Sequence, residues 1–116
     1  MFRFEKLDIW QLAIEYADEI YDLTKRLPKE KKNNFIDQLK RAAVSISNNI
    51  AEGSGTATKK KFCSFLDISV ASTLETVNLL HFAKKRDYIT EEERAKFYNK
   101  AELLVKKITS FKGSLK

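Results

Sequence analysis

The sequence predicts an all-α protein, an antiparallel up-down-up-down four-helix bundle, from three observations. Apolar residues recur at steps of three and four along four long segments, which is the period of a helix face. The breaks between these segments are short, so consecutive helices are expected to run antiparallel. Gly (3) and Pro (1) are too scarce for the many turns of a β-rich fold. The whole chain, residues 1–116, is expected to form a single domain.

The first helix is expected from about Asp8 to Leu27. Asp8 is its expected N-cap, and Pro28 is expected to end it because proline donates no N–H and disfavours the α conformation in the preceding residue. The helix is apolar over much of its circumference, which is typical of a central helix or of one that contacts a partner. The expected core stripe is Trp10, Ala13, Ile14, Ala17, Ile20, Tyr21, Thr24 and Leu27, and the apolar residues off that stripe are Ile9, Leu12, Tyr16 and Leu23.

The second helix is expected from about Asn34 to Glu52, with Asn34 as its cap and Gly53 at the C′ position just past its end. Beside its apolar stripe runs a polar line with few lysines and many small neighbours. That line is either a solvated face or a hydrogen-bonded face packed against another subunit. Its members are Gln38, Arg41, Ser45, Asn48 and Glu52.

The third helix is expected from about Lys59 to Arg86, with Thr58 as its cap. The fourth begins with a capping-box pattern in which Thr90 is followed three positions later by Glu93. The stripe of the third helix is Phe62, Phe65, Leu66, Ser69, Ser72, Thr73, Thr76, Val77, Leu80 and Ala83, and that of the fourth is Phe97, Ala101, Leu104, Ile108, Phe111 and Leu115.

The net charge is +6, from 22 basic and 16 acidic residues, which favours anionic partners such as nucleic acid, an acidic protein or a membrane surface. Solubility alone is the simpler explanation of such a surplus. Lys59–Lys61 is more telling, because the dipole at a helix N-terminus disfavours cations. The lysine triple is either a solvated junction or a phosphate contact. In an up-down bundle the candidate nucleic-acid-binding residues at this end are Lys59, Lys60, Lys61, Arg3, Lys6 and Lys112. Phe2 and Phe4 are the aromatics expected to stack on bases.

No catalytic, cofactor-binding or metal-binding residue is expected. His81 and Cys63 are the only histidine and cysteine, and eighteen helical residues would separate them by about 27 Å. His81 is expected at the surface or its boundary, and Cys63 as a small apolar group. Glu91–Glu93 is explained by a helix N-terminus. The glycines and lysines of residues 53–61 lack the spacing of a phosphate-binding loop, and no strand precedes them.

The expected compartment is the cytoplasm. A single cysteine allows no intrachain disulfide, which fits a reducing environment. The charged start of the chain lacks the apolar core of a signal peptide. No apolar run approaches the roughly 20 residues that a membrane-spanning helix needs, so no membrane partner is expected.

Residues 38–53, QLKRAAVSISNNIAEG, match the pattern Q-L-x-R-A-x-x-S-I-x-x-N-I-A-E-G. The chain also has Phe4-x-x-Leu7-x-x-Trp10-x-x-Ala13 at its start, a proline between the first two helices, and Ser72-x-x-Glu75 in the third helix. These features, which span essentially the whole chain, resemble the bacterial four-helix-bundle family of 23S rRNA intervening sequence proteins. The family commonly has glycine immediately before the serine of the third motif. This chain has Ala71 there, whose methyl group is expected to hold helices slightly further apart.

The resemblance implies an up-down bundle that assembles as a ring, commonly a homopentamer, and it brings no catalytic residue. It also implies a relation to the accessory variability protein of diversity-generating retroelements, a basic pentameric ring that binds nucleic acid and a reverse transcriptase. By this analogy one set of residues is structural or faces another subunit. The set is Gln38, Arg41, Ser45, Asn49, Glu52, Ser72 and Glu75.

Two functional hypotheses follow. The first is an oligomeric accessory protein that binds RNA or DNA mainly through phosphates, with a nucleic-acid-processing protein as a further partner. The second is an oligomeric scaffold for protein–protein interaction with no nucleic-acid role. Binding of labelled nucleic acid that weakens steeply with salt distinguishes the first from the second.

Overall fold

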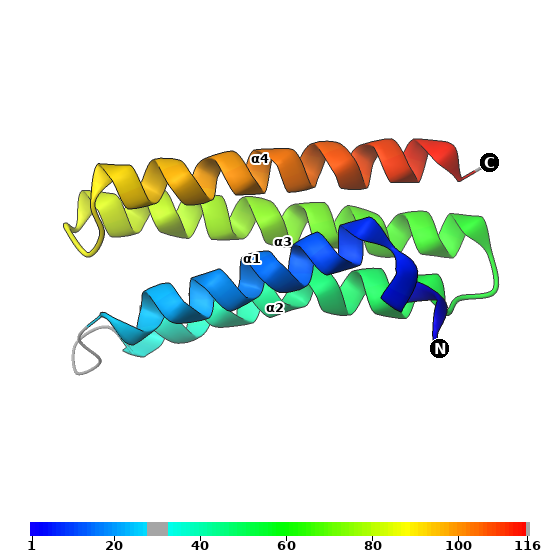
Figure 1. The fold of residues 1–116 in the computed structure, drawn as a ribbon, viewed down its shortest axis with the longest axis horizontal. Coiled ribbons are helices and arrows are strands. Elements are labelled where there is room, and N and C mark those ends of the chain that lie inside the picture. The colour runs from blue at the N-terminus through cyan, green and yellow to red at the C-terminus, as the bar shows by residue number, and fades with distance from the viewer. Residues whose placement is uncertain (28–32, 116) are drawn as a thin grey trace.

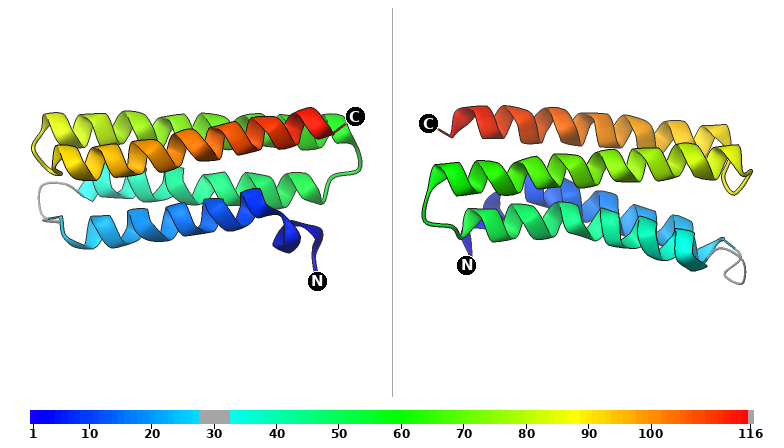
Figure 2. Two further views of the ribbon diagram at one scale, coloured as in Figure 1. Left: turned by 45° about the horizontal axis from the view of Figure 1, so that its top comes forward. Right: turned by 180° about the vertical axis from the view of Figure 1, so that it is seen from behind.

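Helices account for nearly all of the regular structure in the computed structural model, which describes residues 1–27 and 33–115. Within these residues there is no strand, and the elements are the 3-10 helix η1 (Arg3–Lys6), α1 (Asp8–Lys25), α2 (Asn33–Ser54), α3 (Lys59–Lys85) and α4 (Glu91–Ser114). The four α-helices lie side by side, and each runs antiparallel to the one before it (Figures 1 and 2). The start of α1, the α2–α3 connection and the end of α4 therefore share one end of the bundle. The predicted fold class is confirmed.

The expected caps of the third and fourth helices are confirmed. Thr58 Oγ1 accepts a hydrogen bond of 3.1 Å from the backbone N–H of Lys61. Thr90 and Glu93 form the full capping box: Thr90 Oγ1 accepts from the Glu93 N–H at 3.1 Å, and Glu93 Oε1 accepts from the Thr90 N–H at 2.9 Å. Both caps depend only on neighbours along the chain, which is why the sequence is enough to find them.

The expected caps of the first two helices are wrong. Asp8 is the first residue of α1, whose N-cap is Leu7 with no side-chain cap, because η1 leads directly into α1 and Leu7 packs against the core. Asn34 lies inside α2, which begins at Asn33. The helix end expected at Pro28 lies outside the described residues, and α1 itself ends at Lys25.

Gly53 was expected to follow the second helix, but α2 continues through Ser54 and no described glycine has a positive φ. Gly53 is buried where α2 approaches α3. A Cβ added to Gly53 would lie 2.7 Å from the Phe65 Cβ and 2.8 Å from the Phe62 Cδ1. The glycine therefore permits close packing of two helices instead of ending one of them.

The core stripe of α1 is rotated relative to the expected one. Ile9, Tyr16 and Leu23, expected off the stripe, are buried in the core, whereas Ile14 and Tyr21 are 41% and 38% exposed. The reason is that α1 packs against both α2 and α4, so it buries a wide arc that single-face periodicity does not locate. Ile9, Tyr16 and Leu23 are therefore buried within the bundle and do not indicate a surface for a partner.

The core contains a row of hydroxyl groups on α3, and each has a hydrogen-bond partner. Ser69 Oγ donates to the backbone oxygen of Ile46 on α2 at 2.9 Å, and the Thr76 hydroxyl donates to the backbone oxygen of Thr73 at 2.6 Å. The hydroxyls of Tyr16 and Thr76 are 2.7 Å apart. Because the Thr76 proton is already committed, Tyr16 is the donor in that pair.

Tyr16→Phe is expected to reveal this buried hydroxyl through pH. Burial raises the pKa of Tyr16 from 10.0 to about 12. Between pH 10 and 12 the unfolded tyrosine has lost its proton while the folded one keeps it, so stability falls as pH rises, by about 2 kcal/mol. At pH 8 the variant is expected to be about 1 kcal/mol less stable because a buried hydrogen bond is lost.

The measurement is urea unfolding of wild type and Tyr16→Phe at pH 8 and pH 12. The greater stability of the wild type at pH 8 is expected to vanish or reverse at pH 12, because only the wild type carries an ionisable hydroxyl at position 16. A stability difference of the same size at both pH values would contradict this account.

Candidate nucleic-acid interface

Phe62 is the side chain around which one end of the bundle is built. It is buried at the start of α3, and its ring meets that of Phe111 on α4 edge-on, with centroids 5.6 Å apart. The guanidinium carbon of Arg3 on η1 lies 5.2 Å from the Phe62 ring centroid. Gly53 gives α2 room against the same ring. Four elements, η1, α2, α3 and α4, therefore converge directly beside Lys59–Lys61.

Lys59–Lys61 form the first turn of α3, and all three side chains are exposed. No acidic residue stands in that turn, and none of the three has an ion pair with any residue that the structure describes. Cations at a helix N-terminus are opposed by the dipole, so this placement slightly destabilises the helix. The turn thus presents three uncompensated positive charges to solvent.

The other three candidate residues at this end differ in how available they are. Lys6 is exposed and lines a shallow groove with Lys107 between the start of α1 and the end of α4. Arg3 is exposed beside the Phe62 ring. Lys112 donates a 2.6 Å hydrogen bond to Asp67, and that hydrogen bond raises the pKa of the Lys112 ammonium. Asp67 therefore partly neutralises Lys112, which attracts a phosphate less than an unpaired lysine does.

Of the two aromatic residues expected to stack on bases, only Phe2 is freely accessible. Phe2 is 74% exposed and its ring lies nearly parallel to that of Phe4, with centroids 6.1 Å apart. Phe4 packs edge-on against Trp10 at 5.1 Å. Phe4 therefore anchors η1 to α1 and leaves Phe2 as an exposed ring at the lysine end.

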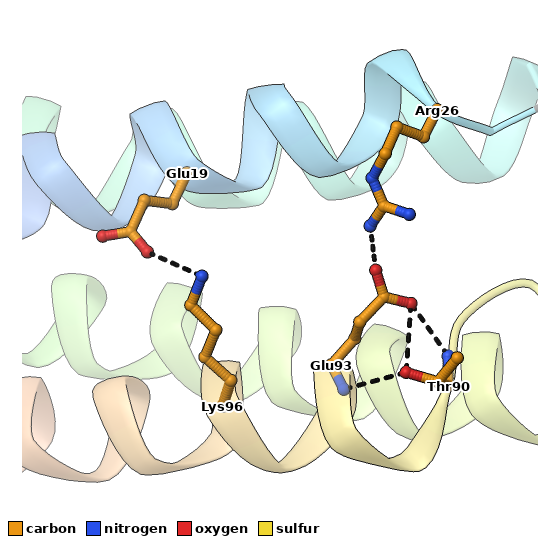
Figure 3. A network of polar contacts seen from close by, with 5 residues as sticks. All are labelled: Glu19, Arg26, Thr90, Glu93 and Lys96. Atoms are coloured by element: carbon orange, nitrogen blue, oxygen red, sulfur yellow. Dashed lines mark hydrogen bonds and ion pairs between the residues drawn. The ribbon is translucent and has the colours of Figure 1, made fainter.

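Toward the opposite end of the bundle, several charged residues form ion pairs within the chain. Figure 3 shows Arg26 at the end of α1 paired with Glu93 of the α4 capping box, and Glu19 of α1 paired with Lys96 of α4 at 3.8 Å. Glu19 also pairs with Lys100. These ion pairs join α1 to α4 and so account for the charges at this end. The charges of Lys59–Lys61 have no comparable role within the chain.

The polar line predicted on the second helix faces α3 in part. The Ser45 and Ser72 hydroxyls are 2.8 Å apart, and the Asn49 amide donates to the Ser45 backbone oxygen at 2.8 Å and to its hydroxyl at 3.0 Å. Ala71 is exposed and does not separate α2 from α3. Ser45 and Ser72 therefore join α2 to α3 within one chain, and Asn49 binds Ser45 from the next turn of α2.

The other residues expected to be structural or to face another subunit are exposed beside the α2–α3 seam, the line of contact around Ser45 and Ser72. They make no ion pair or side-chain hydrogen bond within the described part of the chain, and they are Gln38, Arg41, Glu52 and Glu75. Arg41 stands one helical turn before Ser45, and Glu75 three residues after Ser72. Because α2 and α3 are antiparallel, this places opposite charges on the same side of the Ser45–Ser72 contact.

Features of enzymatic chemistry are scarce in residues 1–27 and 33–115. His81 is exposed, with its ring edge-on to Tyr98 at 6.0 Å, and Cys63 is half-buried near the other end of α3. No group of three or more His, Cys, Asp or Glu side chains there could hold a metal ion. None of the described helices is long and apolar enough to cross a membrane.

The fold and the second-helix motif agree with a comparison against protein families, in which the family described as 23S rRNA-intervening sequence protein matches residues 5–110. The chain therefore belongs to this family. A similar solved structure is that of a protein with unknown function from the S23 ribosomal protein family of Bacteroides thetaiotaomicron. It is 27% identical, the match covers 90% of this chain and 97% of that one, and the TM-score is 0.83. A comparison with curated proteins found no match.

In this member of the 23S rRNA-intervening sequence family, sequence reasoning missed one feature outright. Phe82 on α3 is 50% exposed and stands over a groove between α2 and α3. The sequence does show that Phe82 lies outside the apolar stripe of the third helix, to which its neighbours Leu80 and Ala83 belong. A large apolar residue off the stripe indicates surface use only once its neighbours on other helices are known.

Proposed function

We propose that this protein is a non-enzymatic accessory protein that assembles into a ring of several copies, five by family resemblance, and binds RNA or DNA through Lys59–Lys61. The observation that carries the proposal is the exposed lysine turn without any ion pair in the described structure. A polyanionic backbone is the ligand that three adjacent free ammonium groups suit best.

Binding of this kind is dominated by phosphates and is largely independent of sequence. Arg3 and Lys6 extend the positive surface, and Phe2 offers a ring beside it. A single copy presents a small patch. Repetition around a ring would convert several weak contacts into strong binding by raising the effective concentration of each further patch.

The proposed assembly face is the exposed margin of the α2–α3 seam. Its support is the arrangement of Arg41 and Glu75. They are opposite in charge, exposed, and on the same side of a Ser45–Ser72 contact that fixes the relative position of their helices. In a ring, Arg41 of one copy would meet Glu75 of the next, and small residues nearby would allow close approach. Asn49 is already used within the chain, so it supports this face without facing the partner.

Reversing one of these charges is expected to weaken assembly, because it sets like charges opposite each other. Arg41→Glu alone and Glu75→Arg alone should each shift the sedimentation coefficient toward that of the monomer. The double variant should recover the wild-type value, since the pair is restored with opposite polarity. Assembly that is indifferent to both single changes would place the subunit interface elsewhere.

The test of the proposed function is a fluorescence-anisotropy titration of labelled single-stranded RNA and of duplex DNA, each at low and at physiological salt. Binding that weakens steeply as salt rises is expected. Absence of binding even at low salt would overturn the proposal. It would direct attention to a protein partner and to exposed apolar side chains such as Leu74 and Leu103.

A further inference from the structure

A groove of about 600 Å³ lies between α2 and α3 at the end of the bundle opposite Lys59–Lys61. This is the size range of small-molecule sites in proteins, roughly 300–1,000 Å³. Phe82 is half-exposed in it, and its ring packs at a tilt against that of Phe35, with centroids 6.0 Å apart. Phe35 in turn meets the ring of Tyr88 edge-on at 5.5 Å. The Phe82 ring is therefore held in place while half of it stays open.

Two amides and one ammonium group that line this groove have no polar partner among the described residues. The side-chain amides of Gln38 and Asn78 are exposed and make no hydrogen bond with any described residue, and Lys85 is exposed without an ion pair in that part of the chain. Among the residues that the structure describes, no carboxylate lines the groove. Each amide carries both donors and an acceptor, so the groove joins an aromatic surface, two amides and a cation.

This combination matches a nucleotide whose base is unpaired. A base offers a π-face for stacking on an aromatic ring and an edge of donors and acceptors that Asn and Gln amides complement, and its phosphate attracts an ammonium group. In a duplex the bases are stacked inside and their pairing edges are occupied. The groove chemistry therefore selects single strands, which phosphate contacts at the lysine end do not do.

The groove is also aligned with the lysine turn. Lys60 and Phe82 are 22 residues apart on α3, which is about 33 Å along the axis and about 40° around it. A single strand long enough to follow this edge of α3 can reach both places. A second copy of the chain suits the groove less well, because each copy carries a net charge of +6 and Lys85 is the charged side chain among the described lining residues.

We propose that this groove binds an unpaired base of a single-stranded nucleic acid, stacked on Phe82, with Gln38 and Asn78 at the base edge and Lys85 at an adjacent phosphate. This inference rests on the proposed nucleic-acid binding and adds to it a preference for single strands. Gln38 stands at the margin of the proposed assembly face. The proposal therefore requires that a neighbouring copy in the ring leave the Gln38 amide uncovered.

The test compares single-stranded oligoadenylate, carrying one fluorescent adenine analogue that is quenched by stacking, with a duplex of the same length. Wild type is expected to prefer the single strand and to quench the analogue. Phe82→Leu, which keeps an apolar side chain but removes the ring, should weaken single-strand binding by about 5- to 150-fold and leave duplex binding unchanged. Tyr21→Leu is the matched control, because Tyr21 is an exposed ring with Lys40 over it on another face, and it should change neither.

The outcomes separate this inference from the proposed function. Equal, salt-sensitive binding of single strand and duplex by wild type would overturn the base site and leave the lysine turn as the binding surface. Loss of affinity in Phe82→Leu for both ligands alike, or a change only in sedimentation, would also overturn it and assign the groove to subunit contact. No binding of either ligand would overturn both.

Discussion

Gly53→Leu is expected to lower the free energy of unfolding by about 3 kcal/mol or more, a large part of the 5–15 kcal/mol typical of a domain. The first carbon of the new side chain would already lie 2.7 Å from the Phe65 Cβ and 2.8 Å from the Phe62 Cδ1. The Phe65 Cβ cannot rotate away, since it is fixed to the α3 backbone. The two helices would have to separate, and leucine's better helix propensity of about 1 kcal/mol is too small to offset that.

Gly113→Leu is the matched control. Gly113 also lies in a helix, α4, but nothing would come within 4 Å of an added Cβ. Its variant is expected to be as stable as wild type or up to about 1 kcal/mol more stable. Urea unfolding of both variants supplies the comparison. Equal stability of Gly53→Leu and wild type would mean that the close approach of α2 to α3 does not exist in solution.

The same substitution connects the fold to the interface. Phe62 touches Gly53 on one side and supports Arg3 and Phe111 on others. Displacing Phe62 would therefore disturb the placement of η1 and the end of α4 relative to Lys59–Lys61. We expect Gly53→Leu protein that remains folded at low temperature to bind nucleic acid less tightly than Gly113→Leu protein does.

Replacing Lys59, Lys60 and Lys61 together by glutamine is expected to have the largest effect on binding. Each phosphate contact contributes about 0.7 to 0.9 to the slope of log affinity against log salt, so the slope should become shallower by about 2 to 3. Affinity at low salt should fall by about 100- to 1,000-fold. The fold should persist, because these side chains are exposed and their charges oppose the helix dipole.

The matched control changes the same total charge elsewhere. Lys25, Lys96 and Lys106 are exposed and lie on α1 and α4. Their joint replacement by glutamine should shift the salt slope far less than the Lys59–Lys61 variant. Equal losses in the two triple variants would mean that net charge alone draws the nucleic acid, with no defined site.

The parts of the fold that depend on neighbours in the chain could be predicted from the sequence. Four helices, the Thr58 cap and the Thr90–Glu93 capping box all follow from local spacing. The role of Gly53 could not be predicted, because a glycine that ends a helix and one that admits a second helix look alike until the second helix is placed. The buried face of α1 is not predictable from periodicity alone for the same reason, since two flanking helices decide it.

The candidate site shows the same division. The lysine turn is visible in the sequence as a charge run at a helix start. Its lack of ion pairs and the hydrogen bond of Lys112 to Asp67 depend on residues that are distant in the sequence. Ser45 and Ser72 were both singled out, yet only their 2.8 Å contact shows that they join α2 to α3. The Phe82 groove is built from residues of two helices, so no periodic pattern along one segment predicts it.

The most direct test of the account is a lysine-modification footprint of the wild-type protein with and without single-stranded RNA at low salt. An acylating reagent modifies exposed ammonium groups, and mass spectrometry reads each site. Bound RNA is expected to protect Lys59, Lys60 and Lys61, while Lys25 and Lys106 react at an unchanged rate. Unchanged modification of Lys59–Lys61 while RNA is demonstrably bound would contradict the account.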